Sequence, residues 1–413
     1  MSATLRLCVL CLMLLVARGH QGDGAEKLEG QQSSAANSSA GVPLLTAANR
    51  EFAFRLYRSL AAQPDSRGKN VFFSPLSVSV ALAALAVGAR GETHQQLFRG
   101  LGLSNTSLSQ AQVDQAFQSL FEQTRRTSSQ VTREGTAVFV DHLFKAQPGF
   151  LHTLKQSYFA DGFAVDFSKS SESTDTINKY VKEKTSGKID KLVKDLDPST
   201  VMYLISYIYF KGKWESPFDP DLTQEDVFTV DEETKVPVQM MNLERRFETY
   251  HDQTVNTSVL RLPFNSSHSM LLLLPEHMAQ LEQALSPAHI SKWLKWMKSR
   301  TFNVYVPKFS IKTSASLKDV LTEMGMADMF GDRADLTGIS EGGRLSVSEV
   351  VHQATLDVDE AGATAAAATG IGITLFSFHH VPVLKFDRPF MVIITEHSTE
   401  SILFLGKITN PKI

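Results

Sequence analysis

The sequence predicts an α+β fold in one large domain. Segments with the apolar spacing of helices come first along the chain, and several short runs with the alternation of strands follow. The 413 residues are enough for two average domains, but no Pro/Gly/Ser-rich linker interrupts the middle of the chain. We therefore expect a single domain with a sizeable core, whose strands are mainly antiparallel.

The helices expected in the first half carry capping signals. Ala47–Leu60 has apolar residues close to helical spacing, and Ser74-Pro75 supplies an N-cap and a first-turn proline for a helix that ends at Gly88. The second of these helices is apolar almost all round, which predicts a buried core helix. Further helices are predicted after a cap at Thr93, over Ala111–Thr124, and over Thr174–Thr185 with Gly187 as its C-cap.

The clearest strand lies at Val201–Phe210. It is apolar on both alternating sets of side chains, as expected for a central strand covered on both faces. Shorter strand-like runs occur at Thr136–Val140, Ser269–Leu274, Asn303–Ile311, Phe390–Thr395 and Ser401–Leu405.

The N-terminal segment has the layout of a secretory signal peptide over residues 1–19, with Arg6 before an apolar run and small residues near Gly19. Both cysteines of the chain lie in this segment, so the mature chain would have no disulfide. Residues 20–43 are rich in Gly, Gln, Ser and Ala and predict a disordered tail, which leaves 44–413 as the domain. A secreted, extracellular protein is expected, and it has four glycosylation acceptors, at Asn37, Asn105, Asn256 and Asn265.

Composition argues against several functions. A net charge of -3 does not favour nucleic-acid binding, and no later apolar run reaches the 18 or so residues of a membrane span. The motifs of common hydrolases, G-x-S-x-G and H-E-x-x-H, are missing from the sequence, so we expect no enzyme and no cofactor. His379-His380 is either half of a metal site or, as we prefer, a solvated pair without ligand partners.

One stretch, Asp359–Ser377, has a pattern that stands apart from the rest. Ala363–Ala368 is almost all alanine, and from Thr369 onward large apolar residues alternate with small or polar ones. The alternation is typical of a strand, and the small side chains before it would fit a crowded slot between strands. An alanine-rich helix or a flexible linker is the competing interpretation.

This stretch, followed by Phe386-Asp387-Arg388-Pro389-Phe390, resembles the hinge and the C-terminal signature of the serpins. The resemblance runs from about Leu44 to Ile413, with the motifs in the family's order, and is greatest to secreted clade A members. It implies a serpin-like domain with a large central β-sheet, further sheets, about nine helices and an exposed reactive-centre loop. It also leads us to expect a monomer.

The resemblance implies that a protease cuts the loop and is trapped as an acyl-enzyme when the loop inserts into the large sheet. Counting sixteen residues from Glu360 reaches Phe376, so Phe376-Ser377 is the expected reactive bond, with Leu375-Phe376 as the alternative. An aromatic residue suits the hydrophobic slot of chymotrypsin-like proteases, unless it packs on the body of the protein. The hinge comprises Glu360, Ala361, Gly362, Ala363, Thr364, Ala365, Ala366, Ala367, Ala368 and Thr369.

The resemblance assigns roles to residues outside the loop as well. Ser77 and His352 belong to a polar cluster under the sheet, where Ser206 replaces the family's usual asparagine and requires a different hydrogen-bonding arrangement. At the insertion point Glu360 is expected to pair with Lys308 near Trp214. The basic residues Lys292, Lys295, Lys298 and Arg300 predict either a heparin-binding helix or an ordinary solvated surface.

A second function is compatible with the same fold. Some serpins are not inhibitors and carry a hormone or another small apolar ligand. Carriers tolerate bulky or charged residues at inward-facing hinge positions, whereas Ala363, Ala365, Ala367 and Thr369 are small in this sequence. The hinge therefore favours inhibition.

Overall fold

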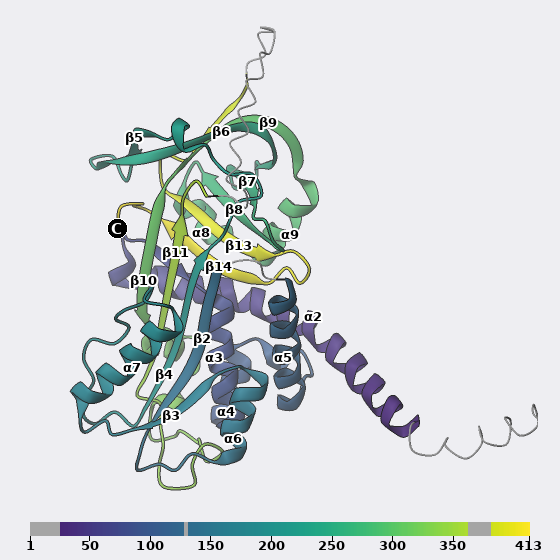
Figure 1. Cartoon of the computed structure of the whole chain (residues 1–413), viewed down its shortest axis with the longest axis vertical. Helices are drawn as coiled ribbons and strands as arrows, with labels where there is room; N and C mark the ends of the chain where they lie inside the picture. The colour runs from purple at the N-terminus through teal and green to yellow at the C-terminus, as the bar shows by residue number, and fades with distance from the viewer. Residues whose placement is uncertain (1–24, 128–130, 362–380) are drawn as a thin grey trace, which may run out of the picture.

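The computed structural model describes residues 25–127, 131–361 and 381–413, and these residues form an elongated α+β domain (Figure 1). The described chain contains nine α-helices: α2 (Ala25–Ala62), α3 (Pro75–Gly88), α4 (Gly91–Gly100), α5 (Gln110–Thr127), α6 (Pro148–Ser157), α7 (Ser170–Lys184), α8 (Met278–Ala284), α9 (Pro287–Trp296) and α10 (Lys318–Glu323). Four short 3-10 helices are η1 (Pro64–Ser66), η2 (Leu103–Asn105), η3 (Pro220–Leu222) and η4 (Asp328–Phe330).

A five-stranded sheet runs along the length of the molecule (Figure 1). Its order is β10 (Phe309–Ser316), β11 (Glu349–Val358), β4 (Met202–Lys211), β2 (Val131–Asp141) and β3 (Asp161–Val165). The β10/β11 and β4/β2 pairs are antiparallel, whereas the β11/β4 and β2/β3 pairs are parallel. Two strands at the centre of this sheet, β4 and β11, therefore run in the same direction.

The other sheet has nine strands, and the pairing within most of it is antiparallel. Its order is β1 (Val71–Phe73), β14 (Ile402–Ile408), β13 (Phe390–Glu396), β8 (His268–Pro275), β7 (Thr257–Pro263), β6 (Lys235–Asp252), β9 (Lys298–Pro307) and β12 (Val383–Lys385), and β5 (Gln224–Thr229) pairs with β6. The β12/β9 pair is parallel.

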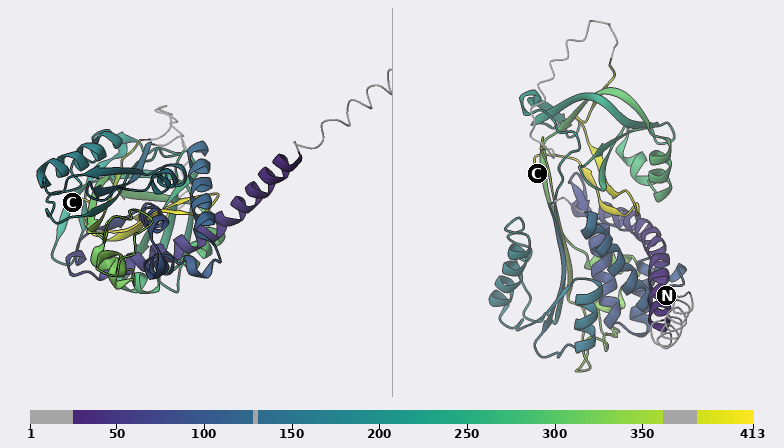
Figure 2. Two further views of the ribbon diagram at one scale, coloured as in Figure 1. Left: turned by 90° about the horizontal axis from the view of Figure 1, so that it is seen from below. Right: turned by 45° about the vertical axis from the view of Figure 1, so that its right-hand side comes forward.

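The five-stranded sheet separates two hydrophobic cores because successive side chains of a strand point to opposite faces. On one face, Phe139 and Tyr207 pack with Ile177 and Val181 of α7. On the other face, residues such as Val138 belong to the main core with the helices α2 to α6. Figure 2 shows this arrangement, with α7 on one side of the sheet and the helical layer on the other.

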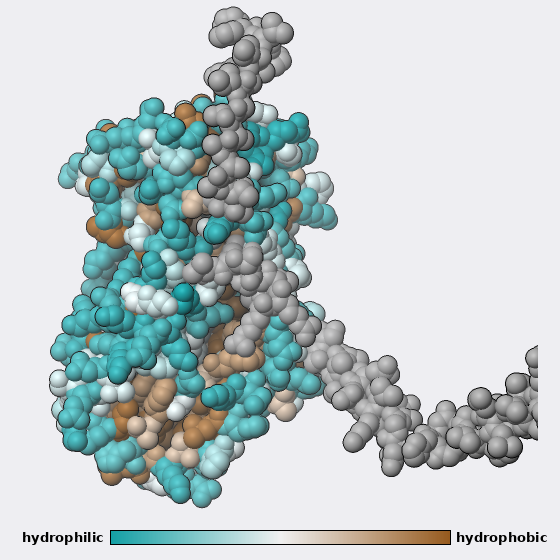
Figure 3. All heavy atoms as spheres, viewed as in Figure 1, coloured by the Kyte–Doolittle hydropathy of each residue, from teal (hydrophilic) through white to brown (hydrophobic). Residues whose placement is uncertain are grey.

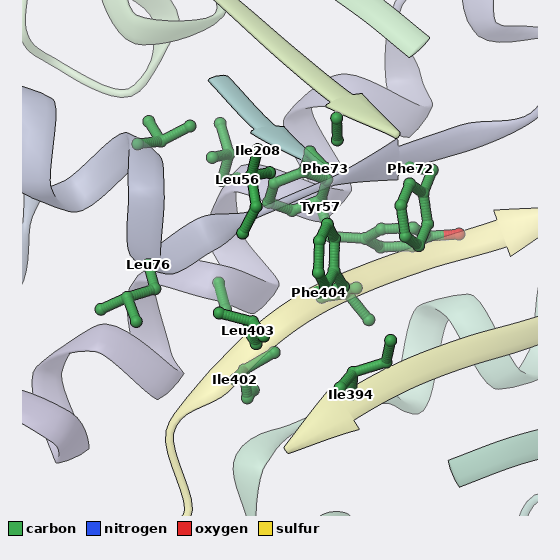
Figure 4. Close-up of a cluster of buried hydrophobic side chains, with 14 of the residues drawn as sticks. Leu56, Tyr57, Phe72, Phe73, Leu76, Ile208, Ile394, Ile402, Leu403 and Phe404 are labelled. Atoms are coloured by element: carbon green, nitrogen blue, oxygen red, sulfur yellow. The ribbon is translucent and has the colours of Figure 1, made fainter. Parts of the chain in front are cut away.

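The centre of the main core joins segments that are far apart in the sequence. Side chains from α2, β1, α3, β4, β13 and β14 meet there (Figure 4), and the rings of Phe72 and Phe404 stack with centroids 5.1 Å apart. The labelled residues are Leu56, Tyr57, Phe72, Phe73, Leu76, Ile208, Ile394, Ile402, Leu403 and Phe404. The chain closes this core without a disulfide in its described residues, where no cysteine occurs.

Several local predictions are confirmed. Ser74 is the N-cap of α3, and its Oγ accepts a hydrogen bond from the Ser77 amide at 3.1 Å. Gly187, with φ of +79°, closes the end of α7 by donating its amide to the Lys182 carbonyl at 2.7 Å. Val201–Phe210 corresponds to β4, whose side chains are buried on both faces.

Three predictions need correction. Thr93 lies inside α4, for which Arg90 is the N-cap, and its hydroxyl accepts a hydrogen bond from the Asp335 amide. Asn303–Ile311 is not one strand, because the chain passes from β9 to β10 at Lys308 and so changes sheets. Helix α2 begins at Ala25, so residues 25–43 of the segment predicted to be a disordered tail are helical.

Candidate functional site

The loop base, which we define as Asp359, Glu360 and Ala361, follows directly from the end of β11. The hinge residues Gly362–Thr369 and the expected reactive bond Phe376-Ser377 lie outside the described residues, as does His379-His380. The chain is described again shortly before β12, where Pro382 accepts a hydrogen bond from the Asn303 amide. Both anchors of the loop are therefore fixed by backbone contacts with the body of the molecule.

Trp214 holds the loop base against the end of β4. Its indole Nε1 donates to the Asp359 carbonyl at 2.7 Å, and its amide donates to the Ala361 carbonyl at 3.1 Å. The ring stacks on Phe264 at 4.5 Å, and Gly212 makes room for that phenylalanine, since a Cβ at position 212 would lie 2.4 Å from its ring. This packing explains why glycine precedes the tryptophan by two residues.

The two carboxylates of the loop base are paired with lysines. Lys308 Nζ lies 2.9 Å from Glu360 Oε2, and Lys211 Nζ lies 2.6 Å from Asp359 Oδ2. Thr223 donates its hydroxyl to the second Glu360 oxygen at 2.9 Å. Lys308 occupies the crossing between the two sheets, which is why it reaches the end of β11.

The electrostatics of Glu360 reflect this enclosure. Its side chain is only 12% exposed, whereas that of Lys308 is 47% exposed. Partial burial raises the pKa of the Glu360 carboxyl, but hydrogen bonds from Lys308 and Thr223 outweigh that effect, so the pKa lies below its ordinary value. Glu360 is therefore ionised at neutral pH. Because Lys308 is half-exposed, its ion pair with Glu360 stabilises the folded protein by only about 0–1 kcal/mol.

Below the loop base, β11 and β4 pair in parallel register from Glu349 opposite Tyr203 to Leu356 opposite Phe210. Parallel ladders are slightly less stable per residue than antiparallel ladders. A strand that folded back after β11 would run antiparallel to both neighbours. The junction between β4 and β11 is therefore the place in this sheet where a returning strand would gain two antiparallel partners.

A serine–histidine cluster, consisting of Ser74, Ser77, Ser206 and His352, lies under this junction. The Ser74 amide donates to His352 Nε2 at 2.9 Å, and Ser74 Oγ donates to Ser77 Oγ at 3.0 Å. Since Nε2 accepts a hydrogen bond, a neutral ring carries its proton on Nδ1, which donates to Ser206 Oγ at 3.1 Å. The cluster thus joins the start of α3 to the facing strands β11 and β4.

Ser206 stands where the family usually has asparagine, and the four members of the cluster are connected by direct hydrogen bonds. His352 is buried, and this burial lowers the pKa of its imidazole to about 3 although a hydrogen bond to Ser206 opposes the shift. The ring is therefore neutral at physiological pH. Sequence reasoning treated Ser74 only as a helix cap and missed its place in this cluster.

The basic residues do not form one helical face as predicted. Helix α9 ends at Trp296, so Lys298 and Arg300 lie on β9, where they face Thr249 and Phe247 of β6. The Lys292 ammonium is held by both carboxylate oxygens of buried Asp252 at 2.9 Å. The regular spacing in the sequence continued past the end of the helix, which is why the pattern gave the wrong arrangement.

Three of the four glycosylation acceptors, Asn105, Asn256 and Asn265, are exposed residues.

Among the described residues, one group of possible metal ligands is Asp141, His142 and Asp166. The two Asp141 oxygens already accept the amides of Leu143 and Phe167, so this group is explained by local structure. In the described segments, no helix has the length and hydrophobicity needed to cross a bilayer.

Comparison with known proteins adds independent findings. The sequence profile of the serpin family (serine protease inhibitor) matches residues 47–411. An alpha-1-antitrypsin-like protein of Tamias sibiricus is 40% identical over 409 residues, which covers 97% of each chain. Human glycosylated kallistatin has a similar structure, with a TM-score of 0.82 and 37% identity over 90% of this chain and 99% of that chain. Human thyroxine-binding globulin complexed with thyroxine gives a TM-score of 0.84 and 33% identity over 90% of this chain and 100% of that chain.

Proposed function

The chain belongs to the serpin family, and on this premise we propose that it inhibits chymotrypsin-like serine proteases as a suicide substrate. It is a protein of an inhibitor family and not an enzyme. In the proposed mechanism, the protease attacks Phe376-Ser377 and forms an acyl-enzyme. The cut loop then inserts between β4 and β11 before the acyl-enzyme can be hydrolysed.

The observation that carries this proposal is the parallel pairing of β4 and β11 directly below the loop base. An inserted strand of about ten residues, with a net ~0.5–1.5 kcal/mol for each ladder hydrogen bond, would stabilise the sheet by on the order of 5–15 kcal/mol. This equals the stability of a typical whole domain, about 5–15 kcal/mol. The free energy that insertion releases is therefore as large as the free energy that keeps a typical domain folded. That is enough to drive insertion while the protease is still attached to the loop.

The hinge composition supports insertion over the carrier alternative. Ala363, Ala365, Ala367 and Thr369 are small, so the inward face of the new strand, to which all four would point, would fit between existing side chains. Thyroxine-binding globulin, complexed with thyroxine, shares the fold, so the fold alone does not separate inhibitor from carrier. The distinction rests on whether the hinge inserts.

The specificity proposal rests on Phe376. A phenylalanine side chain fits a hydrophobic specificity slot and leaves the acidic slot of trypsin-like proteases without a cation. The test is to incubate the protein with chymotrypsin and with trypsin and to resolve the products on a denaturing gel. A covalent complex with chymotrypsin supports the proposal, whereas complete loop cleavage with release of active chymotrypsin contradicts it.

A polyanion such as heparin is a second proposed partner, at a different surface from the helical face expected from the sequence. Lys295 comes from α9, and Lys298 and Arg300 share one face of the adjoining strand β9; none of the three has an ion pair with another described residue. All three of these residues are exposed. Lys292 is excluded from this surface because Asp252 already neutralises it.

The cellular context is part of the same proposal. Residues 1–19 act as a signal peptide, 20–43 precede the serpin domain of 44–413, and the mature protein is a secreted, glycosylated monomer. The apolar segment of residues 1–19 and the exposed acceptors Asn105, Asn256 and Asn265 support this view. Mass spectrometry of the protein from the culture medium of expressing cells tests the cleavage after Gly19 and the glycans, and light scattering tests the monomer.

A further inference from the structure

A cavity lies between β2, β3 and α6, at a distance from the loop base. It has a volume of about 400 Å³, and the segment 142–147, which joins β2 to α6, forms part of its wall. Ligand pockets for small molecules are commonly about 300–1,000 Å³. The cavity is therefore large enough for one small ligand.

Small residues on β3 create this cavity. Gly162 and Ala164 pair with Val138 and Val140 of β2, so all four point to the face of the sheet that α6 covers. A Cβ at Gly162 would lie 2.5 Å from Leu151 of α6, so the helix packs closely there. At Ala164, beyond this contact, the short side chain leaves the space open.

The inner surface of the cavity is apolar. Val138, Val140 and Phe150 are buried in it, with exposed fractions of 0%, 4% and 4%. Among the lining residues, Leu151 of α6 is 37% exposed. Figure 3 shows hydrophobic atoms gathered at the lower end of the molecule, where Figure 1 places β3 and α6.

The charged groups at the cavity favour an anion. Lys145 lines it, is exposed, and has no ion pair with any described residue. His142 also lines it, with Nδ1 3.5 Å from Asp141 and 3.9 Å from Asp166. Asp141 and Asp166 approach His142, but neither of them lines the cavity. Among the lining residues, Lys145 carries a fixed charge, and that charge is positive.

We propose that this cavity binds an amphipathic carboxylate, such as a medium-chain fatty acid of about ten carbons. The alkyl chain would lie on Val138, Val140 and Phe150, and the carboxylate would pair with Lys145. Chain burial supplies most of the affinity, and the ion pair, being near solvent, selects the charged head group. This site is separate from the loop, and it does not depend on the proposed mechanism of inhibition.

The first test is isothermal titration calorimetry of the full mature protein with hexanoate, octanoate, decanoate and decanol. Each buried methylene should tighten binding by at most about fourfold, so affinity should increase from hexanoate to decanoate. Decanol should bind more weakly than decanoate by about two- to fivefold, because it lacks the charge that pairs with Lys145.

Two variants and a matched control locate the site. Ala164→Phe fills the open part of the cavity and should weaken decanoate and decanol binding at least tenfold. Lys145→Ala should weaken decanoate about two- to fivefold and leave decanol unchanged. Lys155→Ala, on the exposed side of α6 and outside the cavity lining, is the control and should leave both ligands unchanged.

Thermal melting of each variant verifies that it is folded, and Ala146→Leu is the alternative filling variant if Ala164→Phe unfolds. Decanoate that does not bind at millimolar concentration, or that binds a folded filling variant as tightly as it binds the unmodified protein, would overturn the proposal. An equal loss of decanoate affinity in Lys145→Ala and Lys155→Ala would also overturn it, because the carboxylate would then respond to the overall charge of the protein and not to Lys145.

Discussion

His352 and Ser206 face each other across the parallel β11/β4 ladder, and their side chains are joined by a hydrogen bond of 3.1 Å. This bond links the two strands that must separate if the loop inserts. The Ser74 amide fixes the opposite side of the same imidazole ring. The His352–Ser206 pair therefore holds β4 and β11 together and also connects them to the N-terminus of α3.

Replacing Ser206 by alanine should destabilise the uncut protein by about 1–3 kcal/mol, because the buried Nδ1–H of His352 loses its acceptor. Ser206→Asn should retain most of the stability, since the amide oxygen can accept the same proton. Urea unfolding monitored by tryptophan fluorescence measures both. Ser104→Ala, at an exposed position, is the control, and an equal effect of Ser104→Ala and Ser206→Ala would contradict the assigned hydrogen bond.

Acidification should destabilise the protein through two buried histidines. Burial lowers the pKa of His352 to about 3 and that of His268 to about 4, whereas an unfolded histidine titrates near 6.5. Below pH 6.5 the unfolded state therefore binds more protons than the native state, and stability falls as pH falls toward these native values.

The expected slope approaches about 1.4 kcal/mol per pH unit for each histidine between pH 6 and pH 5, and it decreases for His268 near pH 4, where the native ring begins to bind protons. Urea unfolding at a series of pH values measures this slope, and His268→Gln should reduce it by about half. A free energy of unfolding that stays constant from pH 6.5 to pH 4 would show that these side chains are accessible to protons in the native state.

The specificity prediction concerns Phe376→Arg. The guanidinium would pair with the acidic slot of trypsin-like proteases, so covalent complex formation should move from chymotrypsin to trypsin. N-terminal sequencing of the fragment released from the unmodified protein by chymotrypsin identifies the cut bond. A new N-terminus at Phe376 would select the alternative bond after Leu375, and any terminus other than Ser377 refutes the primary assignment.

The polyanion prediction uses one lysine as an internal control. Replacing Lys295, Lys298 and Arg300 together by alanine should lower the salt concentration at which heparin-Sepharose releases the protein. Lys292→Ala should not, because the Lys292 ammonium is already bound to Asp252. If the unmodified protein elutes at or below physiological salt, the proposal that this surface binds heparin is wrong.

Local sequence signals predicted much of the fold but not its long-range contacts. Ser74-Pro75 and Gly187 act through their own neighbours, so a helix start and a helix end are readable from the sequence. The change of sheet at Lys308 was missed, although the buried positions shift from even numbers, at Val304 and Val306, to odd numbers after Pro307. That shift was the available signal.

In the candidate site, too, contacts between residues far apart in the sequence were the ones that local patterns did not predict. Resemblance paired Glu360 with Lys308, and the two side chains do meet, with Trp214 beside them. The bond from Thr223 to Glu360 joins residues far apart in the sequence, and no local pattern indicates it. Lys292 had the spacing of a surface cation, but the buried Asp252 that holds it comes from a distant strand.

Insertion itself is tested by a charge in the hinge. Ala365→Arg places a guanidinium on a strand that must be buried, and its desolvation costs several kcal/mol. Because the protease needs only an exposed loop to attack Phe376-Ser377, the variant should still be cut but should release active protease. Ala365→Ser, which is small and neutral, is the control and should still form the covalent complex.

The most direct measurement of the central claim is the melting temperature of the unmodified protein before and after cleavage of its loop by a protease that cuts beyond the hinge. If the cut loop joins the sheet between β4 and β11, stabilisation on the order of 5–15 kcal/mol should raise the melting temperature by roughly 6–20 °C. An unchanged or lower melting temperature after cleavage would contradict insertion, and the carrier function would then be the better explanation of the fold.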